Sequence, residues 1–198
     1  MTRPSHILAI LVIAALALTA CGNNGGSDIM TPRRRAYPRI AATDSVYAPV
    51  GGLPLHLEAN AAAIAARDTS ASASGSTWIN ICYPMYGPKA TIFCTITPIT
   101  STAQLNSVVD NRIERISLNS GGNPGEMLTL ENPAGYRCRL VVNPAGTVTP
   151  VQFLAYNPRH VVTGAFYLDD INQAAPDSVA PVIAAVRRDV IHLLKTLR

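Results

Sequence analysis

Four short runs of strand-forming residues follow one another in the second half of the chain, and the links between them are too short for a parallel arrangement. The runs are Glu126–Glu131, Gly135–Val142, Val151–Tyr156 and His160–Leu168; NPAG follows each of the first two runs and NPR follows the third. Parallel neighbours need a crossover of about a dozen residues or more, whereas antiparallel neighbours need only a tight turn. The sequence therefore predicts a meander of four antiparallel strands.

Two segments have the apolar spacing of amphipathic helices. Thr100–Leu118 carries an i, i+3, i+4 stripe behind Ser101 or Thr102 as N-cap, and Asp177–Arg198 carries a broader stripe with Pro181 in its first turn. The broad stripe must be covered by other apolar groups, so we expect this helix to pack against the sheet.

A hairpin is predicted upstream of the first helix. Thr77–Pro84 (TWINICYP) and Ala90–Pro98 (ATIFCTITP) are rich in β-branched and aromatic residues, and they flank the Gly87–Pro88 turn. The hairpin position favours the core for Trp78 over an exposed aromatic contact surface.

The region before this hairpin is less regular. Leu53–Ala59 alternates apolar and other residues and predicts a short strand, whereas Asn60–Ser76 predicts a helix in its first half and a loop in its second. The composition, 48% apolar and 14% charged, is that of a folded globular protein. Together these elements predict an α+β fold: one antiparallel sheet of six to seven strands packed with two main helices as a sandwich.

The N-terminus reads as an export signal. It carries Arg3, an apolar run from Ile7 to Leu18 and the sequence LTAC, which ends at Cys21. About a dozen apolar residues are too few to cross a hydrocarbon layer of ~30 Å, so this is a secretory signal rather than a transmembrane helix. A small residue before cysteine is typical of lipoprotein cleavage sites, so we predict that Cys21 is lipidated. The alternative is an ordinary cleaved signal that leaves Cys21 a free thiol.

The predicted organisation is a lipoprotein signal peptide (1–20), a flexible lipidated tether with a basic motif (21–40) and a single α+β domain (41–198). Two or three acyl chains hold a protein on a membrane almost permanently. Export excludes nucleic acid as a partner. Because Gly22 follows the lipidated cysteine without an acidic cluster behind it, we expect the protein at the periplasmic face of the outer membrane.

Three further cysteines are present, Cys82, Cys94 and Cys138. An odd number in an oxidising compartment permits at most one internal disulfide. If paired residue numbers in the hairpin sum to 176, Cys82 lies opposite Cys94 and a cross-strand disulfide fits. A Cys94–Cys138 disulfide or three reduced thiols are the alternatives. The sequence contains no CxxC motif, so neither a redox site nor a thiolate zinc site is indicated.

A basic segment, TPRRRAYPRI (Thr31–Ile40), ends the tether. Its side chains of interest are Arg33, Arg34, Arg35, Tyr37 and Arg39. Because the lipid already provides the anchor, two interpretations remain. The segment is either a solvated lead-in whose Tyr37 and Ile40 dock on the domain, or a partner-binding motif whose guanidinium groups form bidentate pairs with carboxylates of another lipoprotein.

The sequence contains no HExxH, HxxxH or GxSxG motif. The histidines of the mature chain are His56, His160 and His192. His192 and Asp189, at i, i+3 on the second helix, are interpreted as a structural polar pair, with His160 near them if the last strand adjoins that helix. Asp169–Asp170 suit a turn better than a calcium site. We therefore predict no catalytic residue, metal or cofactor.

Three stretches carry a recognisable combination of motifs. They are PRRRAYPRI (Pro32–Ile40), WINICYP (Trp78–Pro84), and RHVVTGAFYL (Arg159–Leu168) followed by PDSVAPVIAAVRRDVIHLLKTLR (Pro176–Arg198). They resemble the proline-arginine-tyrosine-arginine signature, the W-x-N-I-x-Y-P hairpin and the C-terminal strand and helix of gliding motility lipoproteins of the GldD family. The resemblance implies an accessory lipoprotein of the gliding and type IX secretion machinery, with other envelope proteins as partners and no established reaction.

Two hypotheses for function follow. The first is a non-enzymatic assembly factor that has no small-molecule substrate. The alternative is a lipid-tethered periplasmic ligand-binding module or weak hydrolase, with its site in a cleft between the sheet and Ala61–Ser76. A pocket on which His160, His192 or Asp169 converge would favour the alternative, and a flat aromatic and basic surface would favour the first.

Overall fold

The computed structural model describes residues 43–69, 75–121, 125–143, 147–168 and 176–198, which all belong to the compact unit Arg39–Arg198. Its elements in chain order are β1 (Tyr47–Pro49), β2 (Glu58–Asn60), β3 (Ile64–Asp68), β4 (Thr77–Cys82), the 3₁₀ turn η1 (Pro84–Tyr86), β5 (Thr91–Pro98), α2 (Thr102–Asn119), β6 (Glu126–Glu131), β7 (Arg137–Val142), β8 (Val151–Tyr156), β9 (His160–Tyr167) and α3 (Pro176–Thr196).

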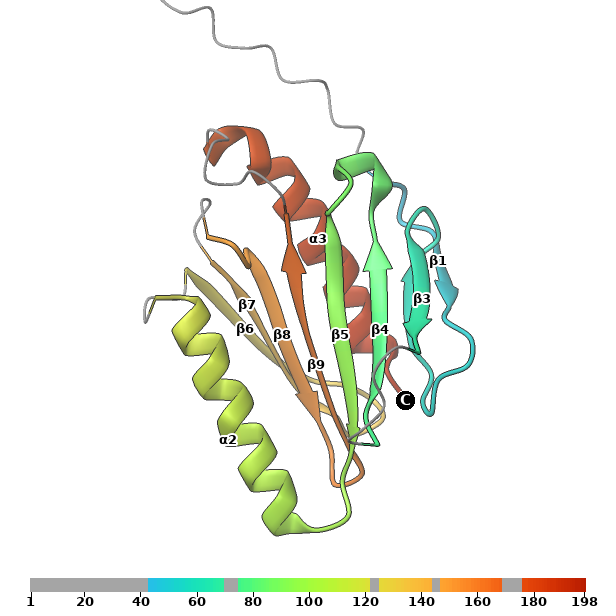
Figure 1. Ribbon diagram of the computed structural model, residues 1–198, viewed down its shortest axis with the longest axis vertical. Helices are drawn as coiled ribbons and strands as arrows, with labels where there is room; N and C mark the ends of the chain where they lie inside the picture. The colour runs from blue at the N-terminus through green and yellow to red at the C-terminus, as the bar shows by residue number, and fades with distance from the viewer. Residues whose placement is uncertain (1–42, 70–74, 122–124, 144–146, 169–175) are drawn as a thin grey trace, which may run out of the picture. The chain divides into compact units, whose positions relative to one another are not determined.

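Seven of these strands form one antiparallel sheet in the order β3-β4-β5-β9-β8-β7-β6, while β1 and β2 pair in a small sheet of their own (Figure 1). This confirms the predicted α+β architecture and the meander from β6 to β9. After β5 the chain passes through α2 to the far edge of the sheet, and the meander returns until β9 pairs with β5. That pairing runs from Thr91 opposite Tyr167 to Pro98 opposite His160, and it joins the two halves of the sheet.

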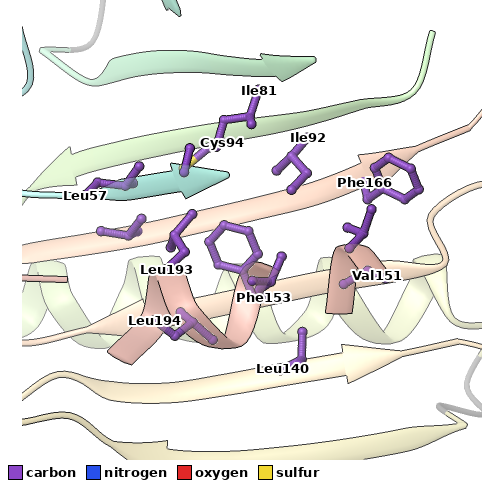
Figure 2. Packing of buried hydrophobic residues seen from close by; sticks show 14 of the residues in the cluster. Leu57, Ile81, Ile92, Cys94, Leu140, Val151, Phe153, Phe166, Leu193 and Leu194 are labelled. Atoms are coloured by element: carbon purple, nitrogen blue, oxygen red, sulfur yellow. The ribbon is translucent and has the colours of Figure 1, made fainter. Parts of the chain in front are cut away.

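One face of the sheet, here called the α3 face, holds the main core. The predicted apolar stripe of α3 is buried there: Val179, Val182, Ile183, Val186, Val190, Leu193, Leu194 and Leu197. These side chains meet inward-facing residues of the sheet, among them Phe153, Ile92 and Leu140 (Figure 2). Each fully buried side chain of this size contributes about 1.5–3 kcal/mol, so this layer dominates the stability of the fold.

The opposite face, here called the α2 face, is only partly covered. The predicted N-cap of α2 is confirmed, because the Ser101 hydroxyl accepts a hydrogen bond from the Gln104 backbone N–H at 3.2 Å. α2 packs on β8 and β9, where Val109 meets Leu154 and Val161 in a second, smaller apolar cluster. The two helices therefore sandwich only one half of the sheet.

The N-terminal part corrects one expectation and shifts another. The strand predicted at Leu53–Ala59 is present but shorter and later in the chain, as β2, whereas the helix predicted in the first half of Asn60–Ser76 is wrong, because β3 lies there. Alanine favours a helix by only a few tenths of a kcal/mol per residue, and an isolated helix this short is not stable. Pairing with β4, from Ile64 opposite Cys82 onward, outweighs that preference.

Candidate functional site

The residues predicted from sequence to anchor the chain and to bind a partner lie outside the described ranges. They are Cys21, Arg33, Arg34, Arg35, Tyr37 and Arg39, and the same holds for Asp169 and Asp170. Within the described ranges, no helix is long and apolar enough to cross a membrane. Those ranges also contain no group of three or more His, Cys, Asp or Glu side chains suited to a metal ion.

The hairpin of β4 and β5 has a different register from the predicted one. Trp78 lies opposite Thr95 and Ile79 opposite Cys94, so paired residue numbers sum to 173 and not to 176. The 3₁₀ turn Pro84–Tyr86 directly precedes Gly87 in the connection between β4 and β5. The midpoint of the hairpin therefore lies closer to β4 than the Gly87–Pro88 turn predicts. An odd shift of register turns the side chains of one strand to the other face relative to its neighbour.

Of the alternatives left open for the cysteines, the cross-strand Cys82–Cys94 disulfide does not fit this register. Cys94 points into the α3 face and Cys82 to the α2 face, and the three described cysteines are unpaired. Burial raises the pKa of Cys94 to about 12 and that of Cys138 to about 11, so both thiols stay protonated. Cys82 is half-buried, and its Sγ accepts a hydrogen bond from the Thr91 hydroxyl at 3.6 Å.

The same register brings three aromatic side chains to the surface of the α2 face. Trp78, predicted to lie in the core, is instead 39% exposed, and Phe93 and Tyr167 are 51% and 36% exposed. Phe93 and Tyr167 meet edge to face, with ring centroids 5.4 Å apart. Trp78 is the diagonal neighbour of Phe93 across β4 and β5. We call these three residues the aromatic patch.

α2 packs on β8 and β9 (Figure 1). Trp78 on β4, Phe93 on β5 and Tyr167 at the end of β9 remain exposed to solvent beside it. Ile64 on β3, 62% exposed, lies opposite Cys82 at the edge of the same face. Contiguous exposed apolar surfaces of this kind mark sites of interaction in soluble proteins, whereas single exposed apolar residues do not.

A groove with a volume of about 170 Å³ lies between the aromatic patch and α2. Phe93 and Tyr167 line it from the sheet, and Arg112 and Arg115 line it from the helix. Its other lining residues include Thr95, Asn119, Gln152, Thr163 and Ala165. The surface beside α2 is thus both aromatic and basic.

The two arginines of the groove are not neutralised within the described part of the chain. Burial, together with the neighbouring charge of Arg115, lowers the pKa of Arg112. No carboxylate of the described residues forms an ion pair with either guanidinium, whereas Arg187 on α3 pairs with Glu126 on β6. An arginine within an otherwise apolar helical stripe was the sequence signal for this site, and the sequence reasoning did not use it.

A polar cluster on the α3 face connects the small sheet of β1 and β2 to α3. The Glu58 carboxylate contacts the Nε2 atoms of His192 at 2.7 Å and of His56 at 3.0 Å. The Tyr47 ring stacks on His192 with centroids 3.6 Å apart. Hydrogen bonds from His192 and then His56 lower the pKa of Glu58. The sequence reasoning did not single out Glu58 or Tyr47.

Asp189 sits beneath this cluster and is only 3% exposed. Its Oδ1 accepts hydrogen bonds from the Tyr47 hydroxyl at 3.1 Å and from the Asn60 amide at 3.3 Å. Burial raises its pKa, and these hydrogen bonds oppose that shift. The expected Asp189–His192 pair is therefore wrong, because each side chain has its own partners.

The remaining histidine of the mature chain, His160, takes no part in this cluster. His160 Nδ1 lies 3.3 Å from the Tyr136 hydroxyl, and desolvation lowers its pKa. His160 and His192 thus serve different contacts, each of which ties neighbouring elements together. On the α3 face Asp189 Oδ2 is buried without a hydrogen-bond partner among the described residues, and His56, Glu58, Lys195 and Arg198 line a second groove. We take the aromatic patch and the groove beside α2 as the candidate site because exposed aromatic and basic side chains gather there.

Comparison with known proteins agrees with the motifs quoted above. The family model described as gliding motility lipoprotein GldD matches residues 27–198, a range that includes the whole sheet, both helices and the candidate site. No curated protein matches the chain. The family match covers most of the sequence, and the chain therefore belongs to the GldD family of gliding motility lipoproteins.

Proposed function

We propose that this protein is a non-enzymatic accessory component of the gliding motility and type IX secretion machinery, held by an acylated Cys21 at the periplasmic face of the outer membrane. Its partners are other envelope lipoproteins or secretion and motility proteins. Membership of the family supports the proposal. The observation that carries it is the aromatic patch of Trp78, Phe93 and Tyr167 on an uncovered half of the sheet.

Aromatic side chains on a rigid sheet suit protein recognition. Trp and Tyr dominate the binding energy of measured interfaces, and full burial of one large apolar side chain contributes about 1.5–3 kcal/mol. The lipid anchor keeps protein and partner in the same membrane, which raises their effective concentration, so a modest contact area suffices. The basic segment Arg33–Arg39 provides a second contact in this proposal.

The alternative, a ligand-binding module or weak hydrolase, needs side chains that converge on a pocket. His160 and His192 instead contact Tyr136 and Glu58, respectively. This division of partners supports contact with proteins rather than catalysis.

The test compares two equally exposed apolar residues of the same sheet face, Phe93 in the patch and Met127 on β6, each 51% exposed. Partners are co-purified from cross-linked cells that produce the full-length protein, Phe93→Thr or Met127→Thr. We expect Phe93→Thr to lose partners at unchanged membrane localisation and thermal stability, and Met127→Thr to keep them. Equal recovery by both variants would refute the proposal. Labelled palmitate should appear on the wild type and not on Cys21→Ser.

A further inference from the structure

We propose that the groove between α2 and the aromatic patch binds an acidic side chain of the partner protein, a glutamate or aspartate flanked by an apolar residue. This inference rests on the proposed function and specifies the chemistry of the partner at the same site.

The arginine pair supplies the first argument. Arg112 and Arg115 are three residues apart on α2, so they lie on neighbouring positions of one helix face, where like charges repel each other. Within the described residues neither forms an ion pair, and burial of Arg112 adds to the cost of the unneutralised charge. A carboxylate that enters the groove relieves both effects, and the guanidinium fork can bind it with two parallel hydrogen bonds.

The aromatic wall supplies the second argument. Phe93 and Tyr167 stand across the groove from the arginines and fix each other's orientation through their edge-to-face contact. A ligand that fills the groove must therefore present a charged group to α2 and an apolar group to β5 and β9. An acidic residue next to an aromatic or aliphatic one meets both requirements from a single extended segment.

The groove is also held in place before any ligand binds. The Asn119 amide at the end of α2 donates a hydrogen bond of 3.0 Å to Oε1 of Gln152, which is buried in β8. Gln152 in turn contacts the Ser120 hydroxyl at 3.5 Å. These contacts fix the helix relative to the sheet, so little conformational entropy is lost when a ligand enters.

The chain contains one tryptophan, Trp78, and it lies opposite Thr95, which lines the groove. Its fluorescence reports binding to the full-length protein in detergent. The probes are a blocked peptide, acetyl-Phe-Glu-Phe-Glu-amide, and its analogue with glutamine for glutamate. We expect the glutamate peptide to bind at least tenfold more tightly, and this preference to shrink as salt rises, since ionic strength screens the charges.

Three double variants, one of them a control outside the groove, test whether the two arginines of the groove cause the preference. Arg112→Gln/Arg115→Gln should abolish the preference for the acidic peptide, and Arg112→Lys/Arg115→Lys should retain part of it because the charge remains. Arg137→Gln/Arg159→Gln removes the same charge from exposed positions outside the groove and should leave the preference intact. Equal binding of the two peptides, or an unchanged preference in the first variant, would overturn the inference.

Vesicles separate a lipid ligand from a peptide ligand. If phosphatidylglycerol vesicles bind through Arg112 and Arg115 while the two peptides bind alike, the groove takes lipid and the inference is wrong. The two proposals fail in distinguishable ways. Loss of co-purification in Phe93→Thr without a peptide preference overturns only the acidic ligand. Unchanged co-purification with a clear peptide preference overturns the proposed function and the assignment of the ligand to a partner protein, while the preference of the groove for an acidic group stands.

Discussion

Asn132 holds the C-terminal end of α3, because its side-chain amide donates a hydrogen bond of 2.7 Å to the main-chain carbonyl of Leu197. The same amide donates to the carbonyl of Leu194 at 2.9 Å. Its Oδ1 accepts hydrogen bonds from the backbone N–H groups of Ala134 and Tyr136, each at 3.0 Å. A single buried side chain thus forms the β6–β7 turn and donates to two carbonyls at the end of α3, where the helix itself supplies no further N–H groups; the Leu194 carbonyl also accepts a long contact of 4.0 Å from Cys138 Sγ.

Exchanging Asn132 for aspartate tests how much its hydrogen bonds to the end of α3 stabilise the fold. Asn132→Asp keeps the acceptor of the turn, loses both donors and places a negative charge at the negative end of the helix dipole. We expect a loss of about 3 kcal/mol or more in the free energy of unfolding, measured with urea. Asn157, in the β8–β9 turn, accepts from Arg159 and His160 in the same way. Among the described residues its side chain also contacts Tyr136 but forms no hydrogen bond with α3. Asn157→Asp should therefore cost less than about 1 kcal/mol, and equal losses would contradict this assignment.

A glycine in β9 is required by the ring of Phe153. A Cβ atom at Gly164 would lie 2.4 Å from that ring, which is fully buried and has no room to move. We expect Gly164→Ala to lower the free energy of unfolding by about 1–3 kcal/mol. Adding Phe153→Leu should recover part of this loss. Gly51→Ala, where a Cβ meets nothing within 4 Å, is the control, and a Gly164→Ala variant as stable as this control would be evidence against the packing described.

The three thiols should differ in reactivity. Burial raises the pKa values of Cys94 and Cys138 to about 12 and 11, so neither is available as a thiolate in the native protein. Cys82 is half-buried on the α2 face. Iodoacetamide followed by mass spectrometry should therefore modify Cys82 first and reach the other two only in denaturant. Recovery of a peptide pair linked through Cys82 and Cys94 would contradict the register of β4 and β5.

The Glu58 cluster predicts sensitivity to acid. Its hydrogen bonds from His192 and His56 lower the pKa of Glu58 below the ordinary value of 4.5. The stabilisation is therefore present above pH 4.5 and is lost as the pH falls through the lowered value. Asp189 acts in the opposite direction, because burial raises its pKa above 3.8 and its ionisation costs stability as the pH rises.

Replacing Glu58 shows how much its carboxylate contributes to the acid sensitivity of the fold. Because Glu58 is partly exposed, Glu58→Gln should cost only about 1 kcal/mol at pH 7. Its urea midpoint should then fall less than that of the wild type between pH 6 and pH 3. Parallel pH profiles for the two proteins would show that the Glu58 carboxylate does not contribute to the acid response.

The meander from β6 to β9 was predictable because its links permit only antiparallel pairing, and α3 because its apolar stripe is continuous. The hairpin register was not, since a 3₁₀ turn before Gly87 is not evident from turn residues alone. This one error explains two wrong predictions. With the shifted register, Cys82 and Trp78 share the α2 face, away from Cys94 and the core.

Only part of the candidate site could be predicted from the sequence. An exposed aromatic and basic surface was anticipated as one outcome, but neither Phe93 nor the Arg112–Arg115 pair was assigned to it. Whether an aromatic residue of a strand is exposed depends on which strands a helix covers. That depends on the position of β9 between β5 and β8, which local periodicity does not encode. Glu58 and Asn132 were missed for the same reason, because their partners lie far along the chain.

The central claim is that the aromatic patch contacts another envelope protein, and site-specific photo-cross-linking tests it most directly. A photoreactive phenylalanine analogue is placed at position 93 or, as the control, at position 127 of the full-length protein, and living cells are irradiated. We expect a discrete adduct with another envelope protein from position 93 and none from position 127. Adducts of equal yield from both positions, or links from position 93 only to lipid or within the chain itself, would contradict it.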